Sequence, residues 1–398
     1  MALKRTICLV LSCALLGGYA SLFTSYHHGF FDELRTCTTD TTSARDRCAL
    51  DMTHAQGNSF PKTYTHIESI DGLIRLLLEF FAQGLRSDPG TKDVDLKALL
   101  TFGYLAAQFG GAWFMIALEG LRLRNTGTVL SWTGSFGIVF QAITITVVAP
   151  IYLTLQLLFS TSGSQTSSVL VDPSDLAILP LATAVSYVLP SIGLCLPLLN
   201  VLSQEGNDLV IALWQPFPLY QSAVQAVLRS FCTGSSRRVG DRVRINPERC
   251  LLALGRAYRF ILCLTMGAHL IVVGTIMASN FTHLLPAVSA TQILAPTSLT
   301  NPPTLALLTP PVSAIGSRAI VVSFLRWDVY YTCASLIIWA AYHLKSTQES
   351  RGWVGIIRKA LLWTIVGGPI APAVMLLWER DAIVLDKLQL SDMRFKRR

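Results

Sequence analysis

The stretch FLRWDVYYTCASLIIWAAYHL, residues 324–344, decides the fold class of this chain. Its 21 residues are mostly apolar, which is the length and composition that a helix needs to cross a bilayer. It nevertheless carries a carboxylate, Asp328, about one turn inside. A charged side chain at bilayer depth costs about 2.5 kcal/mol or more and normally faces a cavity or a partner. The segment therefore predicts a membrane span with a polar site inside it.

The whole chain has the composition of an integral membrane protein. Of its 398 residues, 52% are hydrophobic and 14% are charged, whereas soluble domains are about 25% charged. The net charge of +8 does not indicate nucleic-acid binding, because eight arginines gather between residues 229 and 259, among apolar segments. Such a basic loop is typical of a cytoplasmic membrane face. We expect the lipid bilayer, and no nucleic acid, as a partner.

The apolar segments predict an all-α, polytopic transmembrane helical bundle of seven to nine spans. Residues 1–24 predict either a signal peptide or a first span, and the lack of a clear cleavage site favours a retained signal-anchor. We expect 25–63 to be a polar lumenal segment, 64–378 the transmembrane helical domain and 379–398 a charged tail. Two segments, 64–85 and 208–228, either cross the membrane or lie bent or in its interface. Pro216 and Pro218 predict a helix break in the second of them. The clear later spans lie at about 98–119, 129–158, 176–199, 258–279, 323–344 and 357–378.

Two features orient the chain. The arginine-rich loop at 229–259 predicts the cytoplasmic side, and the sequon Asn280-Phe281-Thr282 predicts a glycosylated, lumenal loop at 280–322. Either span count then leaves the basic tail 379–398 lumenal, which conflicts with the positive-inside rule. If residues 25–63 are lumenal, Cys37 and Cys48 are able to form a disulfide.

Aromatic rings share the helical face of Asp328. At 100° per residue, Tyr331, Trp339 and Tyr342 lie within about 60° of it. A carboxyl group in apolar surroundings favours its neutral form and can act as a general acid. Aromatic faces stabilise a developing carbocation. An acid in a water-poor, aromatic-lined cavity is what protonation-started cyclisation of a polyene requires. The structural alternative is an interfacial carboxylate bonded to Arg326, another helix or water.

Other polar residues leave two interpretations each. Glu119, near the end of the span at 98–119, either pairs with Arg122 or belongs to the site. Trp214 and Gln215 at the proline break either line a pocket or cap freed backbone groups. We expect His269 to be a neutral buried histidine rather than a proton relay. We expect Gln141 to make a hydrogen bond between helices.

Several motifs are absent from the sequence. There is no DDxxD or NDxxD pair for magnesium-bound diphosphate, and no GxSxG, HExxH, Walker A or CxxC motif. We therefore expect metal-free acid chemistry without a cofactor.

Six pieces of the chain, in order, resemble the fungal integral-membrane terpene cyclases of the ascochlorin and macrophorin type. They are YTHIESIDGLIRLLLEFF, ALEGLRLRNTGTVLSWTGSFGIVFQ, VVAPIYLTLQLLFS, ALWQPFPLYQS, SFLRWDVYYTCASLIIWAAYHL and LLWERDAIVL. The resemblance covers most of 64–385. It implies a meroterpenoid cyclase of the endoplasmic reticulum membrane, which protonates a terminal epoxide or alkene of a farnesylated substrate without a metal. The acidic positions that it implies are Glu119 in ALEGLR and Asp328 in RWDVYY.

We therefore expect Asp328 to be the general acid, with Glu119 supporting it by a hydrogen bond or taking the final proton. The ring residues expected to stabilise cations are Trp327, Tyr331 and Trp339. The rival functions are a receptor or small transporter without enzymatic activity, and an acyltransferase for which His343 is the span-end candidate. An apolar, aromatic-lined cavity beside Asp328 or Glu119 favours the cyclase, whereas a polar channel favours transport.

Overall fold

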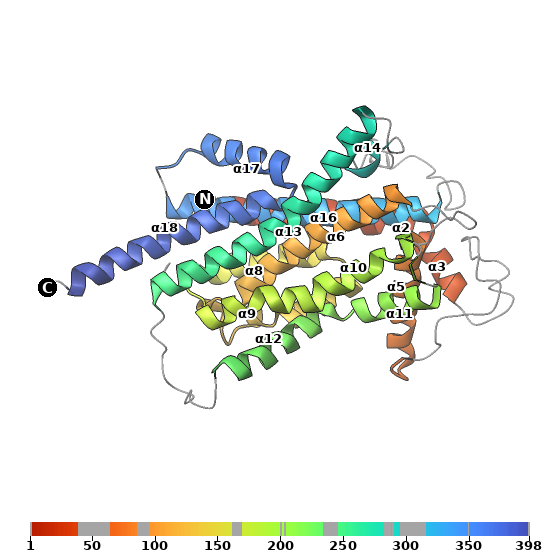
Figure 1. The fold of residues 1–398 in the computed structure, drawn as a ribbon, viewed down its shortest axis with the longest axis horizontal. Coiled ribbons are helices and arrows are strands. Elements are labelled where there is room, and N and C mark those ends of the chain that lie inside the picture. Colours follow the sequence, from red (N-terminus) through yellow and green to blue (C-terminus); the bar gives the residue numbers. More distant parts are fainter. Residues whose placement is uncertain are drawn as a thin grey trace.

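The computed structural model describes residues 2–38, 64–85, 95–160, 169–199, 201–202, 204–233, 246–281, 288, 290–294, 316–348 and 350–396. Within these ranges the regular structure is helical, without strands, so the predicted all-α class is confirmed. Most helices lie along one axis and form an elongated bundle, with both termini toward the same end (Figure 1). We call this end the terminal end and the other the α5 end.

Five helical segments among the described residues are long and apolar enough to cross a membrane. They are α1 (Ala2–Gly18) with η1 (Tyr19–Phe23) and α2 (Thr24–His27); α6 (Leu96–Gly120); α9 (Pro173–Thr183) with η4 (Ala184–Val188), α10 (Leu189–Cys195) and η5 (Pro197–Leu199); α13 (Pro247–Phe281); and α16 (Ser317–Thr347). These segments establish a polytopic helical protein. The count of seven to nine spans stays a prediction.

The predicted single span at 129–158 is instead a helical hairpin of α7 (Thr133–Ala142) and α8 (Ile145–Ser160). At 1.5 Å per residue the arms are about 15 and 24 Å long, shorter than a hydrocarbon core of about 30 Å. The Tyr152 hydroxyl donates to the Leu130 carbonyl at 2.9 Å, and Arg124 donates to the Phe159 carbonyl. The far end of α8 therefore returns to the place where α7 begins. At the tip of the hairpin, Thr144 is buried in the bundle, whereas Ile143 is exposed.

The predicted span at 357–378 is also broken, into α17 (Trp353–Gly367) and α18 (Ala371–Lys396). Gly368 has φ +85° in the turn, a conformation that glycine adopts without strain. Arg351 and Lys359 both bind Glu379, which ties the first half of α17 to α18. The two helices therefore form a second hairpin.

The segment expected as a charged tail, 379–398, continues α18 as far as Lys396. Lys387 on this helix donates to the Thr347 carbonyl at the end of α16, at 3.4 Å. The C-terminus thus lies at the terminal end, where α12 (Phe217–Thr233) ends and α13 begins (Figure 1). The tail and the arginine-rich segment share one end of the bundle, so the conflict with the positive-inside rule is removed.

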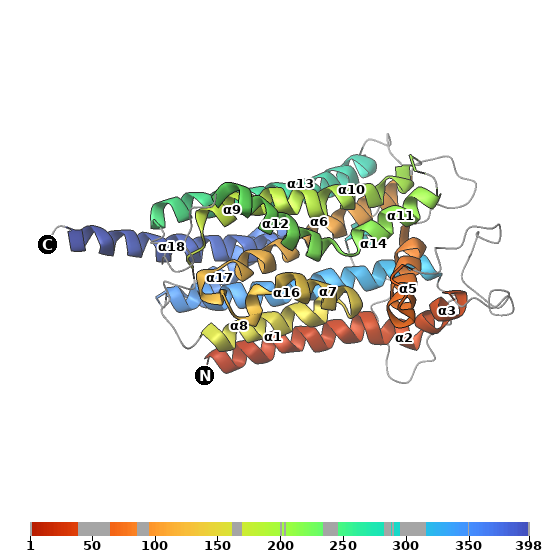
Figure 2. The ribbon, with the colours of Figure 1, turned by 90° about the horizontal axis from the view of Figure 1, so that it is seen from below.

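Helix α5 (Glu68–Leu85) lies across the bundle rather than along it (Figures 1 and 2). It packs against α16 and against α3 (Phe30–Thr38), where the rings of Phe30 and Phe80 meet edge to face at 6.0 Å. This arrangement agrees with the interfacial alternative for 64–85. Part of the segment predicted to be polar and lumenal, 25–63, is helical in α2 and α3, and 39–63 lies outside the described residues.

The proline pair breaks its helix as predicted. Helix α11 (Gln204–Trp214) ends at Trp214, and α12 starts again at Phe217 after residues 215–216. The freed backbone is satisfied inside the protein, since the Gln215 carbonyl accepts a hydrogen bond from Gln141 Nε2 at 3.1 Å. Gln141 thus makes the interhelical hydrogen bond that the sequence predicts.

Helix α1 is packed into the bundle against α8 and α16. The approach is closest at Gly17, where an added Cβ atom would lie 2.1 Å from Thr146 Oγ1 and 2.9 Å from Tyr331 Cβ. A glycine is therefore needed for this crossing. It stands directly beside the segment of α8 that contacts Asp328.

Candidate functional site

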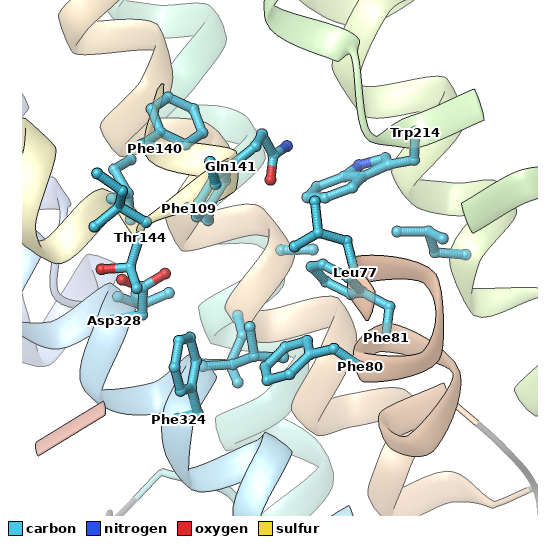
Figure 3. A pocket seen from close by; sticks show the side chains of 18 of the residues that line it. Leu77, Phe80, Phe81, Phe109, Phe140, Gln141, Thr144, Trp214, Phe324 and Asp328 are labelled. Carbon is cyan, nitrogen blue, oxygen red and sulfur yellow. The ribbon is translucent and has the colours of Figure 1, made fainter. Parts of the chain in front are cut away.

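A cavity of about 130 Å³ lies where α5, α6, α11, α16 and the tip of the α7–α8 hairpin meet. It is far larger than the roughly 10–15 Å³ that a single water requires. Nine of its 23 lining residues are aromatic. Six of these rings surround the space in Figure 3: Phe80, Phe81, Phe109, Phe140, Trp214 and Phe324. The wall is apolar and rich in the ring faces that stabilise cations.

Asp328 supplies the one carboxyl group among the described lining residues. Its side chain is 6% exposed, and Oδ1 accepts a hydrogen bond from the Thr146 backbone amide at 2.9 Å. Thr146 is the second residue of α8, so Asp328 satisfies one of the open amides at this helix start from another helix. No ion pair joins Asp328 to Arg326 in the described part of the chain. The carboxyl group is held through Oδ1, with the cavity beside it (Figure 3).

The other polar side chains in the wall are few. The Tyr187 hydroxyl donates to the Ala106 carbonyl at 2.6 Å, and the Trp214 indole donates to Ser191 Oγ at 2.9 Å. Gln141 uses its amide nitrogen for the bond to Gln215. Thr144 lies beside Asp328 at the hairpin tip (Figure 3). The polar groups are thus concentrated at the hairpin tip and Asp328.

The ring residues predicted on α16 do not line the cavity. Trp327 and Tyr331 stack on each other, with ring centroids 5.3 Å apart, and Tyr331 packs at the crossing with α1. Trp339 is buried and donates to Gln156 Oε1 at 2.8 Å. The predicted rings Tyr331 and Trp339 follow Asp328 along α16. The cavity extends in the opposite direction, from Asp328 toward Phe324.

Glu119 lies in a separate buried network. Arg122 Nε donates to Glu119 Oε2 at 2.7 Å, and its Nη2 donates to Asp381 Oδ2 at 2.8 Å. Gln156 Nε2 donates to the other Glu119 oxygen at 3.0 Å. The pairing of Glu119 with Arg122 is therefore the arrangement present in the structure.

The network is remote from Asp328 along α16. Trp339, which shares Gln156 with Glu119, follows Asp328 by eleven residues, or about 16 Å of helix. The structure therefore does not bring Glu119 and Asp328 together, and the expected hydrogen bond between them is absent from the described residues. This part of the prediction is wrong, because Glu119 is bound by Arg122 and by Gln156 of α8 near the terminal end.

The remaining predicted residues fall in different places. Trp214 lines the cavity, whereas Gln215 does not, and its side-chain amide makes no hydrogen bond within the described residues. His269 Nε2 lies 3.0 Å from the Ile365 carbonyl, and His343 Nε2 lies 3.0 Å from Gln156 Oε1. Both histidines are buried and have a packing role in the bundle.

The two predicted modifications lie at the margin of the structure. Asn280 is exposed in the last turn of α13, but Thr282 of its sequon lies outside the described residues. The predicted disulfide also lies outside, because the Cys37 side chain and all of Cys48 do.

Sequence reasoning missed the contributions of α5 and the hairpin tip. Phe80 and Phe81 come from α5, and Thr144 comes from the tip. The signal for the first pair is the LEFF sequence on an amphipathic helix, which places two adjacent rings beside apolar neighbours. The tip carries no proline or glycine, so the sequence offers no sign of the turn.

Fold and cavity together define a helical membrane protein that encloses an apolar, aromatic-walled site with one carboxylic acid. The family model of the CtvD domain matches residues 5–385. The chain belongs to the CtvD-domain family, in agreement with the resemblance to fungal membrane terpene cyclases.

Curated relatives are similar to the chain over most of their length. The terpene cyclase ascI of Acremonium egyptiacum is 27% identical over 81% of this chain and 79% of that protein. The terpene cyclase atmA of Aspergillus flavus is 23% identical over 80% of this chain and 83% of that protein. The terpene cyclase ctvD of Aspergillus terreus is 22% identical over 78% of this chain and 83% of that protein. No solved structure matches the chain.

Proposed function

We propose that this protein is a membrane-bound terpene cyclase in which Asp328 protonates the end of a farnesyl-type chain. The single observation that carries the proposal is the placement of one buried carboxyl group in an aromatic-walled, apolar cavity. Such a space accepts a flexible hydrocarbon and excludes the water that would quench a cation. The names of the relatives support the reaction class, since each is called a terpene cyclase.

The reaction begins at Asp328. Because Oδ1 accepts the Thr146 amide, the acidic hydrogen resides on Oδ2. The O–H bond breaks as the proton moves to a terminal epoxide oxygen or alkene carbon, and its electron pair stays on the carboxylate. The Thr146 amide at the start of α8 then stabilises the negative charge. Internal alkenes attack the cation in turn. The last cation loses a proton from a neighbouring carbon, the C–H electron pair forms an alkene, and the proton passes to the Asp328 carboxylate, which restores the acid.

The rings direct the intermediate cations. Phe324 lies on the side of the cavity near Asp328, and Phe80, Phe81 and Trp214 lie across it (Figure 3). A cation over a ring face gains about 0.5–2 kcal/mol. A folded chain therefore meets ring faces at successive carbons as the positive charge moves.

The substrate that we propose is a farnesyl chain on an aromatic or polyketide head group, as in meroterpenoid pathways. The chemistry that we propose requires no metal or cofactor. The location that we propose is the endoplasmic reticulum membrane, with Asn280 glycosylated on the lumenal side. The apolar wall of the cavity supports a cyclase over a transporter, which needs a polar path.

A membrane assay tests the proposal. Membranes that contain the protein are incubated with a farnesyl-substituted dihydroxybenzene and, separately, with its terminal epoxide. Membranes from the same host without the protein are the control. We expect one of the two probes to give a product of unchanged mass with fewer alkene signals by NMR. If neither probe gives a ring-containing isomer, the proposed function is wrong.

A further inference from the structure

Thr144 has an unusual backbone conformation at the tip of the α7–α8 hairpin. Its φ is +149°, and apart from His66 it is the only non-glycine residue with positive φ in the described ranges. A β-branched residue is a rare occupant of this region, which glycine adopts without strain. Strained residues of this kind cluster at functional sites when the surrounding structure holds them in place. Thr144 is therefore a candidate functional residue at the hairpin tip.

The Thr144 hydroxyl is buried in the cavity wall against the Asp328 carboxyl group. The residue is 6% exposed, and its hydroxyl interacts with Asp328 without the full geometry of a hydrogen bond. The other polar lining groups described above, those of Tyr187, Trp214 and Asp328, make hydrogen bonds of ordinary geometry. A buried polar group without a fully formed hydrogen bond is uncommon and indicates strain, a catalytic role or a missing ligand.

The hydroxyl lies beside the Asp328 carboxyl group (Figure 3). Thr144 comes two residues before Thr146, whose amide donates to Asp328 Oδ1. One turn of the chain therefore presents two donors to the same carboxyl group. A threonine hydroxyl donates one hydrogen bond and rotates freely about its C–O bond, so it is able to reach either the carboxyl group or a bound molecule.

Other buried threonines provide a comparison. The hydroxyls of Thr146, Thr154 and Thr183 make no hydrogen bond in the described part of the chain, and none of these residues lines the cavity. All three lie within helices, where their backbone is unstrained. Thr144 is distinguished from them because its hydroxyl lies against Asp328 in the cavity wall and because its backbone is strained.

We propose that Thr144 is a positioning residue for Asp328, whose hydroxyl donates to Oδ1 during the reaction; this inference rests on the proposed function. With two donors on Oδ1, the acidic hydrogen is confined to Oδ2. When the Oδ2–H bond breaks, its electron pair remains on the carboxylate, and both donors stabilise that charge. The strained turn holds the hydroxyl against Oδ1 before the proton moves.

Three substitutions at Thr144 test the inference. Thr144→Val keeps the shape and removes the hydroxyl, and we expect kcat to fall about 10- to 100-fold, as for the loss of one hydrogen bond to a charged group, with KM nearly unchanged. Thr144→Ser keeps the hydroxyl, and we expect kcat to recover to within a few-fold of the natural protein. Thr144→Gly relieves the strain and removes the hydroxyl, so we expect slow turnover without a loss of thermal stability in detergent.

The control is Thr154→Val, which removes a partnerless hydroxyl from the same hairpin outside the cavity. We expect it to leave kcat and KM unchanged. The inference is overturned if Thr144→Val or Thr144→Gly turns over like the natural protein, or if serine fails to restore kcat to a folded protein. The proposed function fails separately, when the natural protein forms no cyclic product or when Asp328→Asn keeps full activity.

Discussion

Replacing Arg122 with methionine removes the cation that two buried carboxylates share. The Arg122 side chain is 1% exposed and donates to Glu119 at 2.7 Å, to Asp381 at 2.8 Å and to the Val169 carbonyl at 2.8 Å. Methionine fills a similar volume but leaves both carboxylates without this partner. Removing one member of a buried ion pair costs about 3–5 kcal/mol of stability.

The expected effect is measurable by thermal unfolding in detergent. At roughly 2 °C per kcal/mol for a chain of this size, Arg122→Met lowers Tm by about 6–10 °C. A double variant that adds Glu119→Gln neutralises the carboxylate that loses its cation, whereas Asp381 keeps its ion pair with Arg380 at 2.7 Å, so we expect it to recover about half of this loss. The fractional recovery is the informative quantity, because it separates charge from packing.

Arg229 is the matched control. It pairs with Asp175 at 2.8 Å, but its side chain is 46% exposed. Water reaches the Arg229 end of the pair, although the Asp175 side chain is 5% exposed, so we expect Arg229→Met to lower Tm by less than half as much as Arg122→Met. The reasoning is refuted if Arg122→Met is as mild as this control, or if the double variant is no more stable than the single one.

The other predictions concern packing, topology and modification. Gly17→Leu places a side chain against Thr146 and Tyr331, and we expect it to lower both stability and turnover; full activity in folded protein would contradict the close packing of α1 beside the site. Because α1 is part of the bundle, intact-mass measurement of the purified protein finds residues 2–18 present; their removal would contradict a retained first helix. A protease site added after Arg398 and one inserted between residues 234 and 245 are cut from the same side of sealed vesicles, whereas cutting from opposite sides would contradict the two-hairpin arrangement. Asn280→Gln removes a glycosidase-sensitive mass from protein made in a eukaryotic host, and an unchanged mass would contradict modification at this position.

The sequence predicts the helices of this protein well, but not where two of them turn back. Pro216 marks the α11–α12 break because proline removes a backbone donor. Residues 143–144 lie in a continuous apolar run without such a residue, so nothing local distinguishes a hairpin from a span. The turn is stabilised by tertiary contacts, including the bond from the Thr146 amide to Asp328. Contacts between distant segments cannot be deduced from periodicity.

The site shows the same division. The cost of burying a charge singled out Asp328, and the structure places it in the cavity wall. Helical periodicity predicts which residues share a face of α16, but not how far the cavity extends along the helix. Trp339 shares the face of Asp328, yet it lies about 16 Å farther along the helix. Glu119 had two interpretations, and the structure shows the ion pair with Arg122 at 2.7 Å, in a network that Gln156 and Asp381 complete from distant parts of the chain. The sequence contains the acid, whereas the fold determines its neighbours.

The turnover of Asp328→Asn relative to Glu119→Gln tests the central claim most directly. Asparagine keeps an oxygen for the Thr146 amide but has no acidic hydrogen, so we expect cyclisation to fall by about 10²–10⁴ while the protein remains folded. Glu119→Gln changes a buried carboxylate outside the cavity, and we expect the folded protein to keep its activity within roughly tenfold. Equal activity of Asp328→Asn and the natural protein, or a loss confined to Glu119→Gln, would contradict the assignment of Asp328 as the acid.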